Sequence, residues 1–440
     1  MSSSTIILAS SSLFTSNRFA SMYDATDPEW RNDTFLMDFV KQKLLNGQNT
    51  LGKDDRSGSL ACLSVRFALD FNMDGTAGSV VRTQVERHMR LCLAATAGTD
   101  TLVTLAGSEP LLAEAAYQLM EATQSNPVRH LANHSDLNCV DRGRRGELVA
   151  TLLIMRACDA ARAASTLTGN KSVPVDIFMR ELLPQIAYET FEKSFPTYYR
   201  DNEKRKFAQT FEGYGIWFNH VIKVEKKKMV SAVHLWKFIT RGAMILCANY
   251  QEGIDIVIPI CHTKRPLSRH TVTAILVQVK NAEDYQHTID KTLFDRMDPI
   301  KLGIFPDKIP NESELFPNEE KSTPVDPKPV IRIVFALAAR KAGVTFPEER
   351  KRDHHYPDPF TAFDVWCAGL SEEAFKHING ELDLKSYQRL LDRSLRPHDA
   401  FNVQGIHKEA DKLRGTLRRR MAPLTTEDDA HHAVHLRRAD

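Results

Sequence analysis

The chain has 440 residues, of which 58 are lysine or arginine, 56 are aspartate or glutamate, and 42% are hydrophobic. This composition is typical of a soluble globular protein and excludes a collagen, a disulfide-rich miniprotein and a wholly disordered chain. The formal net charge of +2 predicts no strong overall attraction to nucleic acid, so binding of a polyanion would depend on local basic patches.

Seven cysteines are scattered along the chain without any Cys-x-x-Cys pair, which favours a reducing compartment and gives no sign of a structural zinc site. No apolar stretch approaches the roughly 18 residues of a membrane span, so we expect no membrane association. Residues 1–22 are serine-rich and free of acids, which indicates a disordered or targeting-like tail. We interpret the protein as intracellular, nuclear or cytoplasmic, with effector-type secretion as the alternative.

Residues 23–138 are expected to form a helical domain, which would offer the surface for any protein partner. Apolar residues at three- and four-residue spacing predict helices at Phe35–Leu45, Thr83–Ala95 and Pro110–Thr123. A basic start at Arg142 then leads into an apolar run, 148–166, that predicts one long helix with most faces buried. Further helices are expected at Val175–Phe195, interrupted by Pro184, and around Val230–Thr240.

The hydrophobic period then changes to that of strands. Short runs rich in β-branched residues predict strands at Ala243–Tyr250, Asp255–Cys261, Thr271–Lys280 and Val330–Ala339. A helix is expected between the last two, at about Ala282–Arg296, and a proline-rich loop at 304–329. The order of one helix, three strands, one helix and one strand predicts an α+β fold with a mixed central sheet.

The chain beyond residue 345 is expected to be an extension with mostly helical elements. An edge strand is predicted at Phe363–Cys367, with helices near Ser371–Ile378 and Leu384–Leu391. A further helix near His407–Met421 carries three consecutive arginines, which usually form a solvated face.

A possible chemical site lies where two of these strands end. Strand alternation places Gln278 and Lys280 on one face of the third strand, about 7 Å apart along it. Unpaired polar groups in a buried strand cost several kcal/mol, so both side chains should have partners. Asp255, directly after Gly253 and Ile254, opens the neighbouring strand and is carried into the same sheet.

This arrangement of Asp255 followed by Gln278-Val279-Lys280 at the end of an apolar strand resembles the PD-(D/E)XK, or restriction-endonuclease-like, nuclease superfamily. It is also similar to the nuclease modules of Crinkler-type effectors and of fungal proteins in which such a module follows an NTPase. The resemblance covers about residues 140–340. It implies an αβββαβ core over 139–345, with the helical acid of the family matched by Glu147, and leaves 346–440 as a C-terminal extension.

The resemblance implies a metal-dependent endonuclease that hydrolyses phosphodiester bonds, acting on DNA rather than RNA. Asp255 would be the anchoring ligand of Mg²⁺ or Mn²⁺, Glu147 a second ligand and the Gln278 amide oxygen a third. Lys280 would orient the water and stabilise charge on the phosphate. Because glutamine replaces the usual acid, the site loses one negative charge and should bind the metal more weakly.

Two alternatives stay open. About 75 residues separate the helix of Glu147 from the first predicted strand, and Glu189, Glu212 and Glu252 are the alternative candidates for the helical acid. The second alternative is a catalytically degenerate fold that binds nucleic acid or protein in a defence, effector or mobile-element system.

A basic, aromatic-rich stretch precedes the first strand and predicts contact with nucleic acid. A solvated lysine loop beside core aromatics is the alternative. The residues expected to bind are Lys226, Lys227, Lys228, Lys237 and Arg241.

Overall fold

The computed structural model places the chain in two units, of which the first, Met1–Leu391, contains nearly all the residues described below. The predicted tail at 1–22 and the predicted helix near His407–Met421 lie outside the described residues. The structure describes residues 34–67, 69, 77–96, 101–107, 110–124, 126–133, 142–166, 172–199, 204–305, 328–351 and 360–392.

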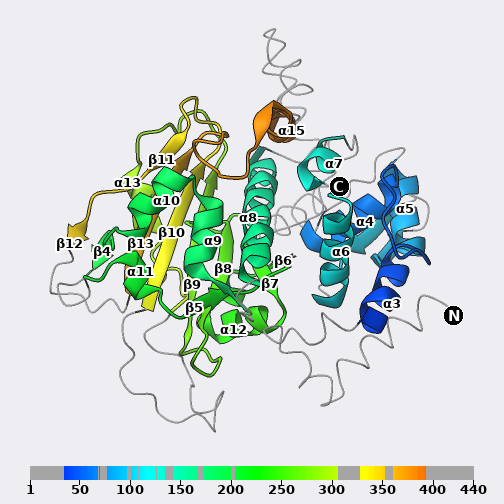
Figure 1. Ribbon diagram of the computed structural model, residues 1–440, viewed down its shortest axis with the longest axis horizontal. Coiled ribbons are helices and arrows are strands. Elements are labelled where there is room, and N and C mark those ends of the chain that lie inside the picture. The colour runs from blue at the N-terminus through cyan, green and yellow to red at the C-terminus, as the bar shows by residue number, and fades with distance from the viewer. Residues whose placement is uncertain are drawn as a thin grey trace, which may run out of the picture. The chain divides into compact units, whose positions relative to one another are not determined.

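The first part of the chain is mainly helical, as predicted, and adds one small hairpin (Figure 1). Its elements are α3 (Thr34–Leu44), α4 (Arg56–Phe67), α5 (Ala77–Arg87), β1 (Leu91–Thr96), β2 (Thr101–Leu105), α6 (Pro110–Ala122) and α7 (Pro127–Asn133). The predicted helix Thr83–Ala95 is wrong in its second half, because β1 pairs antiparallel with β2. Met89, with a positive φ of 60°, lies at the break between α5 and β1.

The long predicted helix is α8 (Arg142–Thr166), and the helices on either side of Pro184 are α9 (Val175–Leu182) and α10 (Gln185–Glu192). Pro184 is the N-cap of α10, a position where its missing N–H costs no helical hydrogen bond. The next elements are β3 (Val173–Pro174), β4 (Tyr198–Tyr199), α11 (Phe207–Thr210), β5 (Tyr214–Ile216), β6 (His220–Lys223), the 3₁₀ helix η4 (Lys227–Met229) and α12 (Ala232–Thr240).

A mixed, open sheet forms the centre of the fold, and eleven strands of the described chain take part in it. The remaining elements are β7 (Ala243–Leu246), β8 (Ile256–His262), β9 (Val272–Lys280), α13 (Lys291–Arg296), β10 (Lys328–Ala336), β11 (Gly343–Thr345), β12 (Arg350–Lys351), β13 (Phe360–Ala368) and α15 (Gly380–Asp392). Strands β7, β8 and β9 run antiparallel, whereas β10 and β13 run parallel to β9. The protein is therefore an α+β protein with a mixed central sheet.

Strand β8 changes partner along one of its edges. Its first residues pair with β7 and its last ones, from Ile260 to His262, pair with β5. Pro259 lies between these two ladders, at a point where a missing N–H is tolerated. β7 and β5 therefore lie side by side against opposite ends of β8.

Three predicted elements beyond β9 need correction. The helix expected at Ala282–Arg296 is confined to α13, because Asp290 caps it by accepting from the Thr292 N–H at 3.0 Å. The segment Ser371–Ile378 forms turns rather than a helix. The strand predicted at the edge is β13, which lies between β4 and β10 with all nine residues buried. The expected boundary near residue 345 falls inside this sheet.

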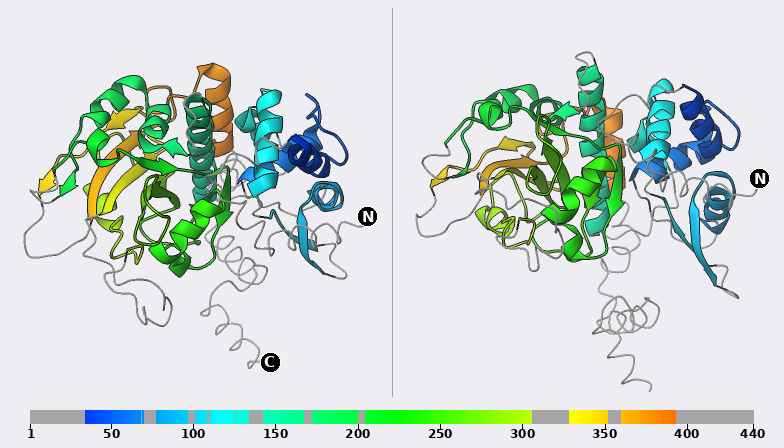
Figure 2. Two further views of the ribbon diagram at one scale, coloured as in Figure 1. Left: turned by 60° about the horizontal axis from the view of Figure 1, so that its bottom comes forward. Right: turned by 90° about the horizontal axis from the view of Figure 1, so that it is seen from below.

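Two apolar cores cover the two faces of the sheet. Figure 2 shows the ribbon, with helices on either side of the strands, from two further directions. The first core is shared with α8, α9 and the N-terminal helices, and the second with α12 and α13. Alternation along β9 follows the prediction: Ile275 and Val277 lie in the first core. Ala274 and Leu276 lie in the second.

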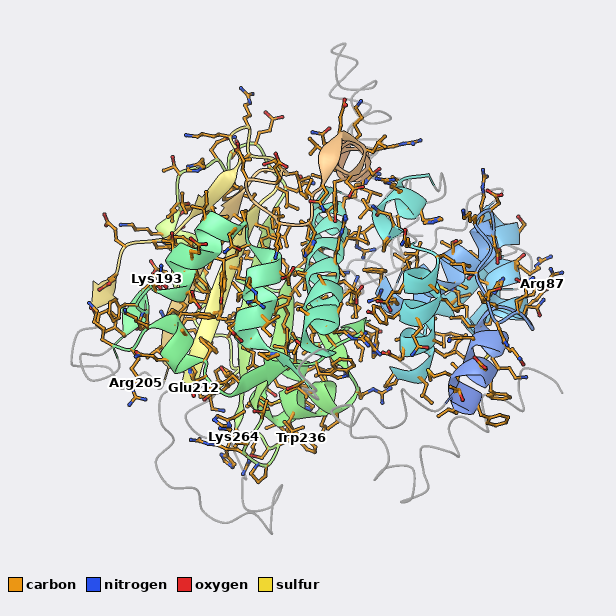
Figure 3. All side chains as sticks on the ribbon, viewed as in Figure 1. Arg87, Lys193, Arg205, Glu212, Trp236 and Lys264 are labelled. Atoms are coloured by element: carbon orange, nitrogen blue, oxygen red, sulfur yellow. The ribbon has the colours of Figure 1, made fainter. Side chains whose placement is uncertain are left out.

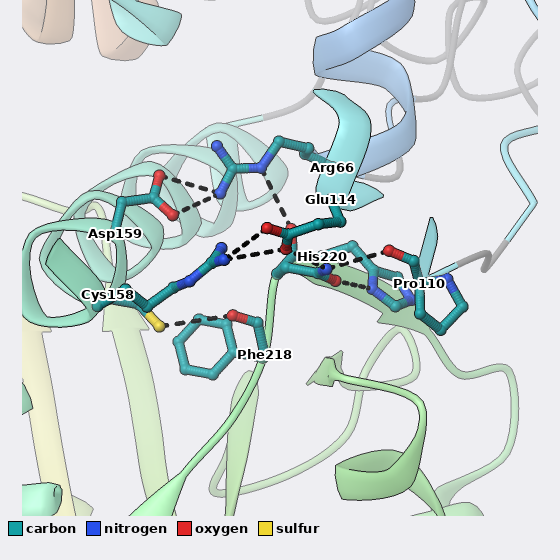
Figure 4. Close-up of polar contacts among 9 residues, drawn as sticks. Arg66, Pro110, Glu114, Cys158, Asp159, Phe218 and His220 are labelled. Atoms are coloured by element: carbon teal, nitrogen blue, oxygen red, sulfur yellow. Dashed lines mark hydrogen bonds and ion pairs between the residues drawn. The ribbon is translucent and has the colours of Figure 1, made fainter. Parts of the chain in front are cut away.

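A buried polar network connects the N-terminal helices to α8 and the sheet (Figure 4). Arg66 on α4 forms an ion pair with Asp159 on α8 at 2.7 Å. Arg162 on α8 pairs with Glu114 on α6 at 2.8 Å. Asn219, just before β6, donates to Glu114 at 3.3 Å and accepts at its carbonyl from Arg66 at 3.2 Å. These contacts make the helical region and the sheet parts of one folded unit.

A further buried ion pair joins two parallel strands on the face of the second core. Arg332 on β10 and Asp364 on β13 are register neighbours and form two hydrogen bonds, of 2.6 and 2.7 Å. Both lie on the wall of a cavity of about 300 Å³. None of the described helices has the length and apolar character needed to cross a bilayer.

Candidate functional site

The polar residues predicted at the strand ends do gather at one end of the sheet. β6, β7 and β9 end there and β8 begins there, because β6 is parallel to β7 and β8 is antiparallel to both β7 and β9. Asp255 immediately precedes β8. Its N–H donates to the Val277 carbonyl at 2.9 Å, and its carbonyl accepts from the Cys247 N–H at 2.8 Å. Asp255 thus joins three strands.

The Asp255 carboxylate extends the ladder between β8 and β9. Its Oδ2 accepts from the Val279 N–H at 2.6 Å. Burial raises the pKa of Asp255, whereas the Val279 N–H and the positive charge of Lys280 act to lower it. The ionised carboxylate is therefore only partly compensated by its surroundings, since burial is the largest of these effects.

Gln278 and Lys280 lie on one face of β9, that of the second core, to which Leu276 also belongs. Gln278 is 5% exposed, and its Oε1 has no hydrogen-bond partner among the described residues. The Lys280 ammonium lies 5.4 Å from the centre of the Tyr285 ring. An amide oxygen without a described partner thus lies near the end of β9, and a partly compensated carboxylate lies just before β8, the neighbouring strand.

Glu147, on the second turn of α8, approaches the same strand end from the other face of the sheet. A Cβ atom on its neighbour Gly146 would lie 3.2 Å from Val279 Cγ1, so α8 packs closely on the end of β9. Burial raises the pKa of the Cys247 thiol, and the Asp255 and Glu147 carboxylates raise it further. Both carboxylates therefore act on one thiol, which places Glu147 in the electrostatic neighbourhood of Asp255.

The residues that could hold a metal ion here are two carboxylates and an amide. Oxygen ligands of these kinds are those that hard divalent cations take in proteins. Among the residues that the structure describes, no group of three or more histidine, cysteine or acidic side chains is placed to hold a metal. Any metal centre at this strand end would therefore depend on the amide of Gln278 as well as on Asp255 and Glu147.

The basic residues expected to bind nucleic acid are divided between the two ends of the sheet. Lys226, Lys227 and Lys228 are exposed and follow β6 at the end that carries Asp255. Lys237 is exposed on α12, with its ammonium 5.6 Å from the ring centre of Trp236. Trp236 lies at the surface (Figure 3).

Arg241 lies at the opposite end, because it follows α12 and precedes the start of β7. There its charge, added to the larger effect of burial, lowers the pKa of His220 to about 3. The five basic residues therefore do not form one patch around Asp255.

The alternative acids lie elsewhere or on loops. Glu189 is exposed on α10 and accepts from Gln185 at 2.7 Å. Glu212 is exposed just before β5, which pairs with the far end of β8 (Figure 3). Glu252 is exposed in the loop between β7 and β8. Of the four acids considered from the sequence, only Glu147 lies on α8, which packs on the end of β9.

Sequence reasoning missed how the loop before β8 holds Asp255. Gly253 has a positive φ of 82°, and a Cβ atom there would lie 2.5 Å from the carbonyl oxygen of Arg296. Only glycine fits both conditions without strain. The dipeptide Gly253-Ile254 before the acid was the available signal. Cys247, which pairs with Asp255 across the base of this loop, gave no signal in the sequence.

A family described as a domain of unknown function, DUF8736, matches residues 51–295, which is more than half of the chain. The match begins just before α4, ends within α13 and contains all four candidate residues. No curated protein and no solved structure matches the chain. The chain belongs to the DUF8736 family.

Proposed function

We propose that the protein is a metal-dependent endonuclease that hydrolyses phosphodiester bonds of nucleic acid, with DNA as the preferred substrate. The observation that carries the proposal is the buried Gln278 Oε1, which has no partner among the described residues and lies on the strand next to Asp255. A buried acceptor without a partner costs free energy that a bound cation would recover. The raised pKa of Asp255 points the same way, because a cation would stabilise its ionised form.

The order of elements supports a restriction-endonuclease-like core. α8 is followed by the antiparallel strands β7, β8 and β9, then by α13 and by β10, which runs parallel to β9. This is the order that the sequence resemblance implies. The additional strands and the helices between α8 and β7 are insertions relative to that minimal core.

The site residues divide the work of hydrolysis. When bound, Mg²⁺ or Mn²⁺ would polarise the phosphate and lower the pKa of the attacking water. Asp255 and Gln278 would supply oxygen atoms to the ion, and Glu147 would reach it past the end of β9 from the other face of the sheet. Lys280 supplies a positive charge beside Asp255 that stabilises the negative charge developing on the phosphate oxygens.

Cleavage assays with the full-length protein test this proposal directly. We expect nicking of plasmid DNA with Mg²⁺ or Mn²⁺ and none with EDTA. Asp255→Asn, Lys280→Met and Glu147→Gln should each abolish cleavage and keep the circular dichroism spectrum of the wild type. Glu212→Gln is the matched control, because this exposed acid lies at the far end of the sheet. Equal cleavage by wild type and Asp255→Asn would remove Asp255 from the catalytic site.

A second candidate function, metal-free binding of nucleic acid, is favoured by one observation. The Asp255 carboxylate already accepts a hydrogen bond from Val279, which a purely structural role would explain. Calorimetric titration with Mn²⁺ separates the two functions. A metal site predicts binding that Asp255→Asn removes, whereas a binding module predicts no metal binding and unchanged affinity for DNA in EDTA.

A further inference from the structure

The loop between β7 and β8 presents one aromatic side chain to solvent close to the candidate site. The hydrogen bond from the Cys247 N–H to the Asp255 carbonyl closes this loop, and the Gln251 N–H donates to the Ala248 carbonyl at 3.1 Å within it. Tyr250 lies at the tip, with 91% of its side chain exposed. Its backbone has a positive φ of 60°.

A positive φ is unfavourable for a bulky residue, and no packing of the Tyr250 ring compensates for this cost. Residues with a β-carbon seldom adopt a positive φ, and the strain they store there tends to mark functional positions. Because the Tyr250 ring is almost fully exposed, burial does not offset the strain. The next residue, Gln251, has a buried Oε1 without a hydrogen-bond partner among the described residues. The Gln251 N–H bond to the Ala248 carbonyl places Tyr250 at the third position of a turn, where a positive φ is required but glycine or asparagine is the usual residue.

The position of Tyr250 relative to the candidate site follows from the chain. Two residues lie between Cys247 and Tyr250, so their Cα atoms lie within about 11 Å of each other. Cys247 in turn bonds to Asp255. The loop also packs against the end of α13, where Gly253 meets the Arg296 carbonyl and the Arg296 side chain is exposed. Tyr250 therefore belongs to the loop that leads to Asp255 and that packs against the end of α13 carrying Arg296.

An exposed ring next to cations is the arrangement that proteins use to bind unpaired nucleic acid strands. Cationic side chains follow the phosphates, and aromatic rings stack on bases whose faces are free. Here the cations are Lys280, Arg296 and the Lys226–Lys228 segment, which follows β6 at the same end of the sheet. A base within a duplex is already stacked on both faces, so a protruding ring favours an unpaired base.

We propose that Tyr250 stacks on an unpaired base of the nucleic acid held at the Asp255 site. The substrate class is then a single strand or a duplex with an unpaired nucleotide. This inference rests on the proposed function in one respect, namely that nucleic acid binds at this end of the sheet. It does not require that the bound strand be cleaved.

Fluorescence anisotropy with the full-length protein in EDTA tests the stacking without any cleavage. The probes are a fluorescein-labelled single-stranded oligonucleotide and its duplex. Tyr250→Ala should weaken binding of the single strand by about 5- to 100-fold, whereas Tyr250→Phe and Tyr250→Trp should change it by less than about twofold. Phe35→Ala is the matched control, because Phe35 on α3 is an aromatic residue with 82% exposure.

Each result bears on the stacking separately from the hydrolysis. A selective loss for the single strand in Tyr250→Ala supports stacking, even if no variant of the protein cleaves DNA. If Tyr250→Ala lowers the affinity for single strand and duplex equally, or no more than Phe35→Ala does, the stacking proposal is wrong, even if cleavage depends on Asp255. Binding of a protein partner and of neither oligonucleotide overturns the stacking and the nuclease together.

Discussion

Replacing Gln278 by methionine should stabilise the metal-free protein. The side chain is 5% exposed, and its Oε1 lacks a hydrogen-bond partner among the described residues. Leaving a buried acceptor without a partner costs about 1–3 kcal/mol, and methionine has a similar length without that acceptor. We therefore expect Gln278→Met to raise the free energy of unfolding by about 1–2 kcal/mol in EDTA. Val334, the register neighbour on β10, is apolar and accommodates the change.

With Mg²⁺ or Mn²⁺ present, the wild type should become more stable than Gln278→Met. A ligand that binds only the folded protein stabilises it by about 2.7 kcal/mol at a hundred times its dissociation constant. The wild type should gain this stabilisation with Mg²⁺ or Mn²⁺, and Gln278→Met should lose most of it. Gln278→Glu should behave in the opposite way: less stable in EDTA because a second buried carboxylate lies beside Asp255, and more strongly stabilised by metal.

Urea unfolding at one pH, with EDTA and then with a metal titration, measures both effects. Gln84→Met is the matched control, because Gln84 on α5 also has a buried Oε1 without a partner in the described structure, away from the strand ends. It should show the same metal dependence as the wild type. A Gln278→Met variant that is less stable than wild type in EDTA would refute the argument from the unpaired amide. An unchanged metal dependence would refute its role as a ligand.

Three further predictions concern Asp255, a buried ion pair in the middle of the sheet and the loop before β8. Because burial raises the pKa of Asp255, the native protein binds more protons than the unfolded chain between the usual carboxyl pKa and the raised one, so stability should fall as pH rises through that window. Asp255→Asn should flatten this fall in urea titrations at several pH values. Asp364→Ala should lower the free energy of unfolding by about 3–5 kcal/mol, because Arg332 is then left buried without its ion-pair partner. The double variant Asp364→Leu, Arg332→Met should regain most of this free energy in the same assay. Gly253→Ala should cost about 1–3 kcal/mol in thermal or urea unfolding, because alanine has to adopt a positive φ against a backbone carbonyl.

Elements defined by local sequence were predicted well. The run 148–166 is apolar on most faces and forms the greater part of α8, the longest helix described. Pro184 ends one helix and caps the next, as its missing N–H requires. The β-branched runs became β8, β9 and β10, because continuous apolar segments of this length suit strands buried on both faces. In each case the information lies within about ten residues of the chain.

Elements defined by distant partners were predicted less well. Residues 91–95 were predicted as the end of a helix but belong to the strand β1, because the pairing of β1 with β2 overrides a weak helical period. β13 was predicted at an edge and lies inside the sheet, because β4 and β12 come from other parts of the sequence to cover it. Neither pairing can be deduced from the residues of the strand itself.

The candidate site divides along the same line. That Gln278 and Lys280 share a face follows from strand alternation, and that Asp255 lies next to them follows from the antiparallel connection of β8 to β9. The bond from Val279 to the carboxylate and the burial of the Gln278 oxygen depend on packing between elements, which no local pattern encodes. The same holds for the placement of Arg241 at the far end of β7.

The burial of this strand end also gives a physical reason for a glutamine at position 278. Asp255 is already disfavoured in its ionised form, and an acid on the neighbouring strand would add a second charge of the same sign in a poorly solvated place. Glutamine keeps an oxygen atom that can ligate a cation and removes the repulsion between two carboxylates. The metal-free fold is then more stable than it would be with an acid, and the affinity for a cation is lower. In the function proposed above, this strand end would hold a cation only weakly until a phosphate supplies further oxygen ligands. Metal and nucleic acid should then each bind more tightly in the presence of the other.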